Sequence, residues 1–314
     1  MPLRAQERIA PREAEWSRPS SSDAEELDPL ERSWMRRFIS QVESRQHEND
    51  LLEVHDVSPV LGGLRSGAGT TAGLLYEAFE QGDPLYVSVS ARASVRGYWG
   101  TEGLFGLEAR PYVAYAYARY WHLPQEDFYG VGPNTPESDR SSFRQDELLI
   151  GGLAGFNPGG HLFVGGHASF LENRVGSGDQ PGIPTVMAAF EPSEVPGFHP
   201  GVSYLAAGAW VEYDTRELPP LRAYGSRFSP SQERLQGLSL DARRGLNASV
   251  ELRHYLDLDG GEYGFSRLML ESQQYFPIAK GRVVVALREY GSFARVDEGE
   301  VIPFYMMQPL GGVR

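Results

Sequence analysis

The sequence lacks cysteine, has a single lysine and contains no long apolar run, and each absence narrows the classes of protein that it can encode. Without cysteine there are neither disulfides nor thiolate metal sites. Lys280 is the only lysine among 29 basic residues, and the formal net charge is −13, so a basic surface for nucleic acid is not expected. No run approaches the ~18 apolar residues of a membrane-spanning helix. A Gly-x-Ser-x-Gly nucleophile elbow is also absent, which argues against a patatin-type lipase.

Two long segments alternate apolar and polar residues. In 85–96 the odd positions are apolar, and in 246–259 every even position except His254 is aliphatic. Successive side chains of a β-strand point to opposite faces, so each segment predicts a strand with one apolar and one polar face. Strands of soluble proteins usually have about 5–6 residues, whereas these reach the roughly 9–11 residues that a tilted strand needs to cross a bilayer. Long alternating strands with a polar inner face are typical of a membrane β-barrel.

The same alternation recurs along most of the chain. It predicts nine strands, at 71–79, 84–97, 104–121, 143–156, 161–172, 201–213, 244–258, 264–276 and 281–293. We expect tight turns at 100–103, 157–160 and 277–281, and long loops at 122–142 and 173–200. Short turns at one end and long loops at the other are typical of outer-membrane barrels. The segment 214–243 is an exception, since it is long but falls on the short-turn side.

The first fifty residues differ from the rest. Residues 1–50 are rich in Arg, Glu, Ser and Gln, so we expect this tail to be largely disordered. A helix is expected from Glu31 to about Val42, where Trp34, Phe38 and Val42 recur at four-residue spacing. No signal-peptide pattern follows Met1. This favours a start further upstream, a lost signal or a soluble protein, and the 36 glycines also allow a Gly-rich soluble β-sandwich.

Four segments carry recognisable motifs. The first two are Phe128-Tyr129-Gly130-Val131-Gly132-Pro133-Asn134 and Tyr213-Asp214-Thr215-Arg216, the latter followed by Pro219 and Gly225. The others are Phe265-Ser266-Arg267-Leu268 with Gln274-Tyr275-Phe276-Pro277-Ile278, and Ile302-Pro303-Phe304-Tyr305 with Leu310-Gly311-Gly312. In this order they resemble motifs of the BamA/TamA-type outer-membrane barrel family, also called the bacterial surface antigen family. The matched features are a Phe-Tyr-Gly-x-Gly-x-Asn loop, a Tyr-Asp-x-Arg strand end, a late strand ending in Tyr-Phe-Pro and the entry to a long sixth extracellular loop.

The resemblance implies an all-β fold, an antiparallel transmembrane β-barrel of which this chain holds about 9–11 of about 16 strands. The barrel domain is expected at 51–314, truncated before its last strands, behind the tail at 1–50. In the family an aliphatic-Arg-Gly-aromatic motif follows Leu-Gly-Gly, whereas this sequence ends at Arg314. Val95-Arg96-Gly97-Tyr98 spells that motif, but in an early predicted strand, where we interpret the match as chance. An alternating pattern expected of the family's POTRA domains is not seen ahead of the strands.

The resemblance also implies a function. The family inserts or translocates proteins at the outer membrane of Gram-negative-type bacteria, by opening a seam whose edge strand pairs with a client strand. Expected partners are outer-membrane lipid and unfolded outer-membrane client proteins, without a cofactor, a metal, nucleic acid or enzymatic activity. The alternatives are a passive pore-forming or structural barrel and a soluble β-rich binding protein.

The residues that carry the resemblance are the candidate site residues. They are Phe128, Tyr129, Gly130, Gly132, Tyr213, Asp214, Arg216, Tyr275, Phe276, Pro277, Gly311 and Gly312. Asp214 and Arg216 are two apart and would share the lumenal face of a strand end. They form either a charge network that holds the returning loop (the long sixth loop), as the resemblance implies, or a solvated local ion pair worth roughly 0–1 kcal/mol. An acidic stretch with Asp257, Asp259 and Glu262 is expected to be a hairpin turn rather than a calcium loop.

Overall fold

The computed structural model describes residues 53–307, apart from 63, 66, 81–83, 110, 133–134, 199–200, 217–243 and 279–282. The chain divides into two units, Met1–Asp50 and Leu51–Arg314, and all described residues belong to the second. The predicted N-terminal tail and its helix therefore lie outside the described residues.

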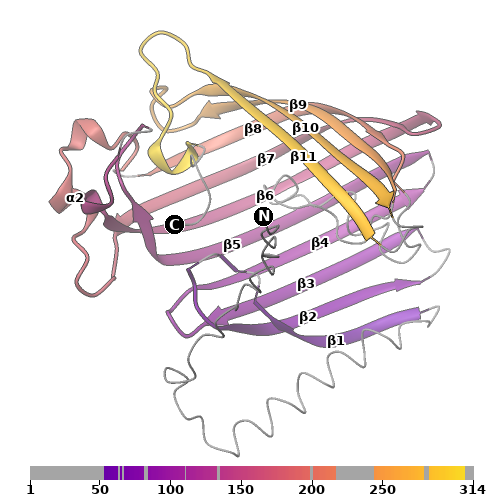
Figure 1. Ribbon diagram of the computed structural model, residues 1–314, viewed down its shortest axis with the longest axis horizontal. Coiled ribbons are helices and arrows are strands. Elements are labelled where there is room, and N and C mark those ends of the chain that lie inside the picture. The colour runs from indigo at the N-terminus through magenta and orange to yellow at the C-terminus, as the bar shows by residue number, and fades with distance from the viewer. Residues whose placement is uncertain are drawn as a thin grey trace, which may run out of the picture. The chain divides into compact units, whose positions relative to one another are not determined.

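Eleven strands form one antiparallel sheet in which each strand pairs with its neighbours in the chain (Figure 1). They are β1 (Glu53–Leu61), β2 (Thr71–Glu80), β3 (Leu85–Ser94), β4 (Trp99–Ala109), β5 (Tyr112–Phe128), β6 (Ser141–Gly159), β7 (Leu162–Ser177), β8 (Val202–Asp214), β9 (Gly245–Asp257), β10 (Phe265–Ile278) and β11 (Val283–Arg295). Short helical turns lie outside the sheet at α2 (Val186–Ala189), η1 (Glu137–Asp139), η2 (Pro192–Glu194) and η6 (Phe304–Met306). None of the described helices is long and apolar enough to cross a membrane.

The sheet is curled, and within the described residues it is not closed, because β1 and β11 are its two edges (Figure 1). The prediction of an all-β antiparallel fold is confirmed. Two prolines fit their positions in this sheet, since proline cannot donate a ladder hydrogen bond. Pro59 lies in the edge strand β1. Pro124 lies in β5 where the register to β6 shifts between Leu123 and Glu126.

Four local predictions are wrong. β1 was not predicted, and the strand expected at 104–121 is two strands, β4 and β5, that meet at 110–111. The turn expected at 100–103 lies inside β4. Two glycines of β4 lie under aromatic rings, because a Cβ on Gly100 would lie 2.5 Å from the Trp121 ring and one on Gly106 2.6 Å from the Tyr115 ring. Val95–Tyr98 is the β3–β4 turn and not part of a strand.

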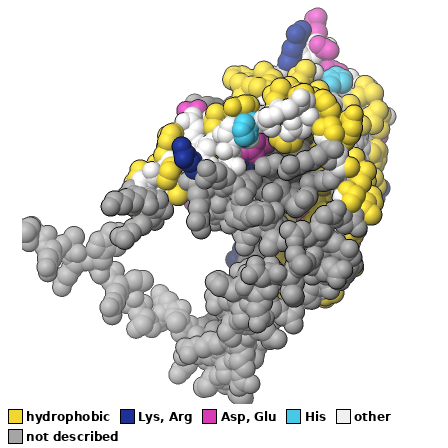
Figure 2. Space-filling view, turned by 90° about the vertical axis from the view of Figure 1, so that its right-hand side faces the viewer, with side chains coloured by type: hydrophobic (Ala, Val, Ile, Leu, Met, Phe, Trp, Pro, Cys, Tyr) yellow, Lys and Arg dark blue, Asp and Glu magenta, His cyan; other side chains and the backbone are white. Residues whose placement is uncertain are grey.

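The two faces of the sheet have opposite chemical character. On β8 the even positions are mostly buried on the inner side of the curl, and they include Glu212 and Asp214. The outward positions Leu205, Val211 and Tyr213 are 44–48% exposed. The sheet therefore places ionisable groups inside and hydrophobic groups outside. Figure 2 shows the hydrophobic side chains along the outer surface of the described residues.

The outward residues form an apolar band with aromatic borders. On β6 the band comprises Leu148, Ile150, Gly152, Ala154 and Phe156, and on β8 Leu205, Ala207, Ala209, Val211 and Tyr213. Five successive outward positions span about 26 Å along a strand. At one border Trp99 and Tyr120 have ring centroids 5.1 Å apart, and at the other Tyr112 and Phe156 are 5.3 Å apart. Outer-membrane barrels carry an apolar band of this kind, about 25 Å tall, between aromatic girdles.

The connections also differ between the two ends of the strands. Only two residues separate β4 from β5 (110–111) and β6 from β7 (160–161), whereas long connections at 129–140 and 178–201 lie at the opposite end. The first is shorter than the predicted loop 122–142, because β5 continues to Phe128. The segment 215–244 joins β8 to β9 at the short-turn end. The sequence predicted this end, because successive connections in such a sheet alternate between its two ends.

The ring of Trp210 packs directly over two inward glycines, and this contact gives the first testable prediction. A Cβ on Gly165 would lie 2.5 Å from the Ala154 carbonyl oxygen and 2.6 Å from the Trp210 ring. We expect Gly165→Val to lower the free energy of unfolding by about 1–3 kcal/mol, since the backbone oxygen cannot move aside. Gly103→Ala is the matched control, because a Cβ on Gly103 meets nothing within 4 Å. Urea unfolding of both variants in detergent checks the prediction, and an equal loss in both would contradict it.

Candidate functional site

The inner face of the sheet carries a series of ion pairs. Arg119 pairs with Glu147 between β5 and β6, and Glu251 of β9 contacts both Arg253 and His167, whose Nε2 lies 3.0 Å from the carboxylate. Other inward charges lie on β8 and β10. In these pairs each charge lies beside an opposite charge, which offsets the cost of removing both from water. The inner wall thus carries paired charges.

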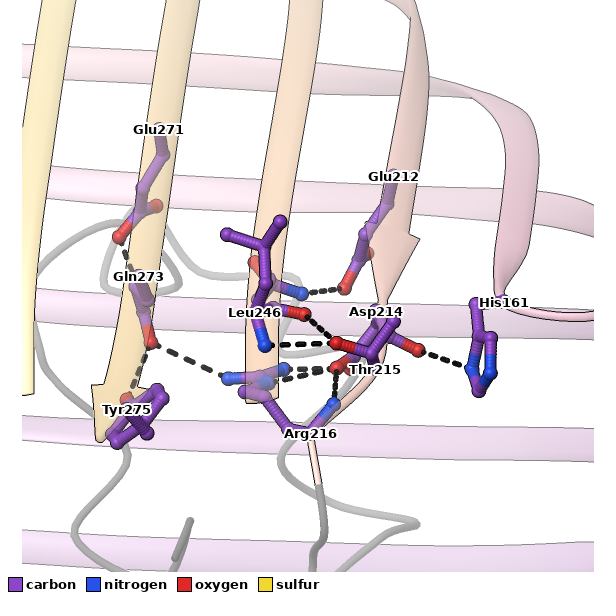
Figure 3. A network of polar contacts seen from close by, with 10 residues as sticks. His161, Glu212, Asp214, Thr215, Arg216, Leu246, Glu271, Gln273 and Tyr275 are labelled. Atoms are coloured by element: carbon purple, nitrogen blue, oxygen red, sulfur yellow. Dashed lines mark hydrogen bonds and ion pairs between the residues drawn. The ribbon is translucent and has the colours of Figure 1, made fainter. Parts of the chain in front are cut away.

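The predicted pair Asp214 and Arg216 lies at the short-turn end of β8 (Figure 3). The Arg216 side chain donates from Nε to Asp214 Oδ1 at 3.0 Å and from Nη2 to Oδ2 at 2.9 Å. The Arg216 backbone N–H donates to the same Oδ1 at 2.9 Å. The side chains are 0% and 7% exposed, so this is a buried bidentate pair and not a solvated one. Charge-assisted bidentate bonds of this type are among the stronger polar contacts in proteins.

This pair is connected to a chain of contacts across β8, β9 and β10 (Figure 3). Arg216 Nη1 donates to Gln273 Oε1 at 3.3 Å, and the Tyr275 hydroxyl donates to the same oxygen at 2.8 Å. Gln273 Nε2 donates to Glu271 at 2.7 Å, and Arg288 of β11 donates to Glu271 at 2.8 Å. The network therefore reaches from the end of β8 to the edge strand β11.

The same network fixes the point at which the chain leaves the sheet. Thr215 N–H donates to the Leu246 carbonyl at 2.7 Å, and Leu246 N–H donates to Thr215 Oγ1 at 2.9 Å. His161 Nδ1 lies 3.0 Å from the Asp214 carbonyl oxygen. These bonds join the ends of β8 and β9 to the β6–β7 turn. The Asp214–Arg216 pair thus anchors the start of the long connection 215–244.

The described part of the returning loop lies at the opposite end of the strands. Residues 296–307 follow β11, and the Arg267 guanidinium donates from Nη2 to the Met306 carbonyl. Arg267 also lies over the Phe265 ring, 5.1 Å from its centroid. Among the described residues, Arg267 holds this loop and Arg216 does not contact it. The role of Asp214 and Arg216 that the resemblance implies stays a prediction.

The returning loop ends in an aromatic cluster that covers the inner face near the long-loop end. Phe304 has ring centroids 4.8 Å from both Phe128 and Phe143, and 6.3 Å from Phe198 of the β7–β8 connection. Its backbone N–H donates to the Pro196 carbonyl at 3.0 Å. Burial raises the pKa of the neighbouring Tyr305 phenol above its ordinary value, so this group stays neutral. We call Phe128, Phe143, Phe198 and Phe304 the aromatic cap.

The other residues with a resemblance to family motifs take several positions. Phe128 belongs to the aromatic cap, and Tyr129 follows it directly. Gly130 and Gly132 have φ of 102° and 113°, a conformation that glycine adopts at little cost. Tyr275 is buried in the inner network, whereas Tyr213 and Phe276 face outward, and Pro277 is the second-to-last residue of β10. Gly311 and Gly312 lie outside the described residues.

Within the described residues, the acidic groups do not form a metal site. Asp257 accepts backbone N–H bonds from Asp259, Gly261, Glu262 and Tyr263 at 2.7–3.1 Å. Asp259 in turn accepts the Ser203 N–H at 2.6 Å. Both carboxylates stabilise the β9–β10 turn, in agreement with the sequence prediction of a hairpin turn.

Fold and site together define a class of protein: an antiparallel β-sheet curled around a charged interior, with an apolar outer face. Among solved structures the fold is similar to BamA from Haemophilus ducreyi lacking POTRA domains 1–3, with a TM-score of 0.50 and 10% sequence identity. The match covers 89% of this chain and 56% of that chain, so this chain spans little more than half its length. No family model matches the sequence, and no curated protein does so. The similarity shows the fold, and family membership stays a prediction.

Sequence reasoning did not find several residues of the inner wall. Arg119, Glu147 and Glu251 all point inward from strands in which polar and apolar residues alternate. Their position in this alternation is the sequence signal that identifies them. Their pairing could not be predicted, because it depends on the register between strands. Phe304 belongs to a motif in the sequence, but nothing in the sequence places it against Phe128.

Proposed function

We propose that this protein is an outer-membrane β-barrel protein of the class that inserts or translocates other proteins. The observation that carries the membrane placement is that the sheet has polar groups inside and apolar groups outside, the reverse of a water-soluble protein. Buried ion pairs such as Arg119–Glu147 lie on the inner face, and the apolar band with its aromatic borders lies on the outer face. An apolar outer face of this height would be unfavourable in water, and a bilayer covers it. The location would be the outer membrane of a Gram-negative-type bacterium, with outer-membrane lipid as the first partner.

The assembly role is supported by the similarity to the BamA barrel and by the free edge of β1. Within the described residues, β1 pairs on one side only, with β2. On its other side the described residues leave the backbone N–H and C=O groups of β1 unpaired, and a strand of an unfolded client could join them by β-augmentation. Client proteins are therefore the second class of partner that we propose. We further propose that the protein carries out no chemical reaction on them.

Refolding of a client barrel tests the assembly role. The full-length protein is reconstituted into lipid vesicles, and an unfolded outer-membrane barrel protein is added. We expect the client to fold several-fold faster than in vesicles that hold an equal mass of a passive barrel protein. In the parent bacterium, deletion of the full gene should lower the levels of outer-membrane proteins. If neither client folding nor the levels of outer-membrane proteins changed, the assembly role would be disproved, while the membrane placement would be unaffected.

A passive pore is the second candidate, and the charged inner wall favours it, because ions pass through polar lumens. The aromatic cap argues against a permanently open pore, since Phe304 and its neighbours occupy the long-loop end of the inner face. In planar bilayers we expect the full-length protein to give only small or brief currents. Large, stable currents from single molecules would instead establish the pore.

A further inference from the structure

Charged side chains on the outer face of the central strands lie at one end only. On β5, β6 and β7, the charged residues that point outward all lie toward the long-loop end of the strands. At the short-turn end the outward residues of these strands are Tyr112, Phe156 and Leu162. Outer-membrane barrels have their longer loops on the extracellular side. With the membrane placement proposed above, the charged end would therefore lie in the outer leaflet.

One row of outward residues crosses four strands at this end. Each residue of the row is the cross-strand partner of the next, and the row comprises Trp99 of β4, His122 of β5, Asp146 of β6 and Arg174 of β7. Three strand spacings give the row a length of about 14 Å. Trp99 is 45% exposed and marks the border of the apolar band. The row therefore lies where lipid headgroups meet the hydrocarbon.

Arg144 brings a second guanidinium group to the β7 end of this row. It is the cross-strand partner of Gly176, and a Cβ on Gly176 would lie 2.8 Å from Arg144 Nη2. The guanidinium group thus lies against the backbone of β7, two residues from Arg174. Since β6 and β7 are paired on both sides, a further strand of the sheet cannot lie beside them. We call Trp99, Arg144 and Arg174 the border site.

Both arginines of the border site keep the outer edge of the guanidinium group open. Arg144 Nε lies 3.3 Å from Asp146 Oδ2, and Arg174 Nε donates to Glu172 Oε1 at 2.6 Å. Nη1 and Nη2 of both arginines form no hydrogen bond with the residues that the structure describes. The two arginine side chains are 47% and 71% exposed. The carboxylates therefore orient the arginines, while the Nη1–Nη2 edges stay available to a phosphate, which arginine binds through two parallel hydrogen bonds.

We infer that the border site binds the phosphorylated sugar headgroup of a glycolipid in the outer leaflet, an inference that rests on the membrane placement proposed above. Arg144 and Arg174 donate to phosphate oxygens, and a sugar ring packs against the exposed ring of Trp99. The phosphate of an ordinary phospholipid would reach the arginines alone. A headgroup of linked sugars covers the row from Arg174 to Trp99, and this favours the glycolipid.

Lipid titration followed by native mass spectrometry tests this inference. The full-length protein in detergent is titrated with bisphosphorylated lipid A, with dephosphorylated lipid A and with phosphatidylglycerol. We expect bisphosphorylated lipid A to bind most tightly, and Arg144→Gln/Arg174→Gln to weaken its binding by about tenfold or more. Trp99→Leu should weaken it several-fold and leave phosphatidylglycerol binding unchanged. Because both arginines are exposed, we expect the arginine variant to unfold in urea like the wild type.

Arg140→Gln is the matched control for the double variant. Arg140 is an exposed arginine at the same end, but it donates from Nε and Nη2 to the two carboxylate oxygens of Asp127. We expect this variant to leave lipid A binding unchanged. Equal binding by the wild type and the double variant, or an equal loss in Arg140→Gln, would overturn the inference. Equally tight binding of phosphatidylglycerol would also overturn it and would identify a general site for anionic lipid instead.

Flotation of the reconstituted protein with phosphatidylcholine vesicles separates this inference from the membrane placement. A protein that floats with the vesicles but does not bind lipid A would contradict the border site alone. A protein that fails to float would contradict the membrane placement itself.

Discussion

Asp214→Ala is expected to destabilise the sheet by about 3–5 kcal/mol, because it removes one partner of a buried ion pair. The Asp214 carboxylate accepts three hydrogen bonds from Arg216, and its side chain is 0% exposed. Removing it leaves a guanidinium that is 7% exposed without its counter-charge. We expect urea unfolding in detergent to show the loss. The double variant Asp214→Ala/Arg216→Ala should recover part of it, because no buried charge is then left unpaired.

Glu172→Ala is the matched control for this prediction. Glu172 and Arg174 have the same two-residue spacing on one strand and the same type of ion pair, at 2.6 Å, but the Arg174 side chain is 71% exposed. Exposed pairs contribute about 0–1 kcal/mol. If Asp214→Ala and Glu172→Ala proved equally mild, the Asp214–Arg216 pair would be only a local surface contact, which is the second of the two roles considered from the sequence.

Phe304→Ala is expected to open the aromatic cap. The ring is buried against Phe128, Phe143 and Phe198, and truncation of a buried phenylalanine costs about 3–5 kcal/mol. The cap can open while the sheet stays folded, since its contacts lie on loops and strand ends. We therefore expect amide exchange at residue 304 to accelerate by roughly 100-fold or more. This N–H donates to the Pro196 carbonyl in the closed cap.

The control for the cap is a neighbouring residue in the same loop. Val301 is 45% exposed, and its backbone N–H donates to the Glu262 carbonyl, a bond that Val301→Ala leaves in place. We expect Val301→Ala to leave both exchange at residue 304 and the single-molecule currents unchanged. Phe304→Ala should also increase the currents. Unaltered exchange in Phe304→Ala would show that other contacts hold the loop closed.

The fold could be predicted from the sequence where it depends on the alternation of side chains between the two faces of a strand. The alternation at 85–96 and 246–259 predicted β3 and β9 closely, because one face must be apolar and the other polar along the whole strand. β1 was missed because its residues do not follow this alternation along the whole strand and because it contains Pro59. The start of β4 was predicted as a turn because a strand glycine under an aromatic ring, such as Gly100, resembles a turn glycine in sequence.

The site was less predictable, because it depends on contacts between distant strands. The spacing of Asp214 and Arg216 predicted that they share a face, and the structure shows them in direct contact. The extension to Gln273 and Tyr275 required the register of β8, β9 and β10. The use of Arg267 to hold the returning loop required the fold of residues 296–307, for which the sequence carries no periodic signal.

The nearest-neighbour pairing of the strands has a consequence for the route of folding. Since every strand pairs only with those adjacent in the chain, each hairpin can form next to one already made, and the entropy of loop closure stays small at each step. The aromatic cap is the exception, because Phe304 must meet Phe128 and Phe143 from the far end of the described chain. We expect the strands of the sheet to pair first and the aromatic cap to form last. A folding intermediate would then have all eleven strands paired while the long-loop end of the inner face is still uncovered.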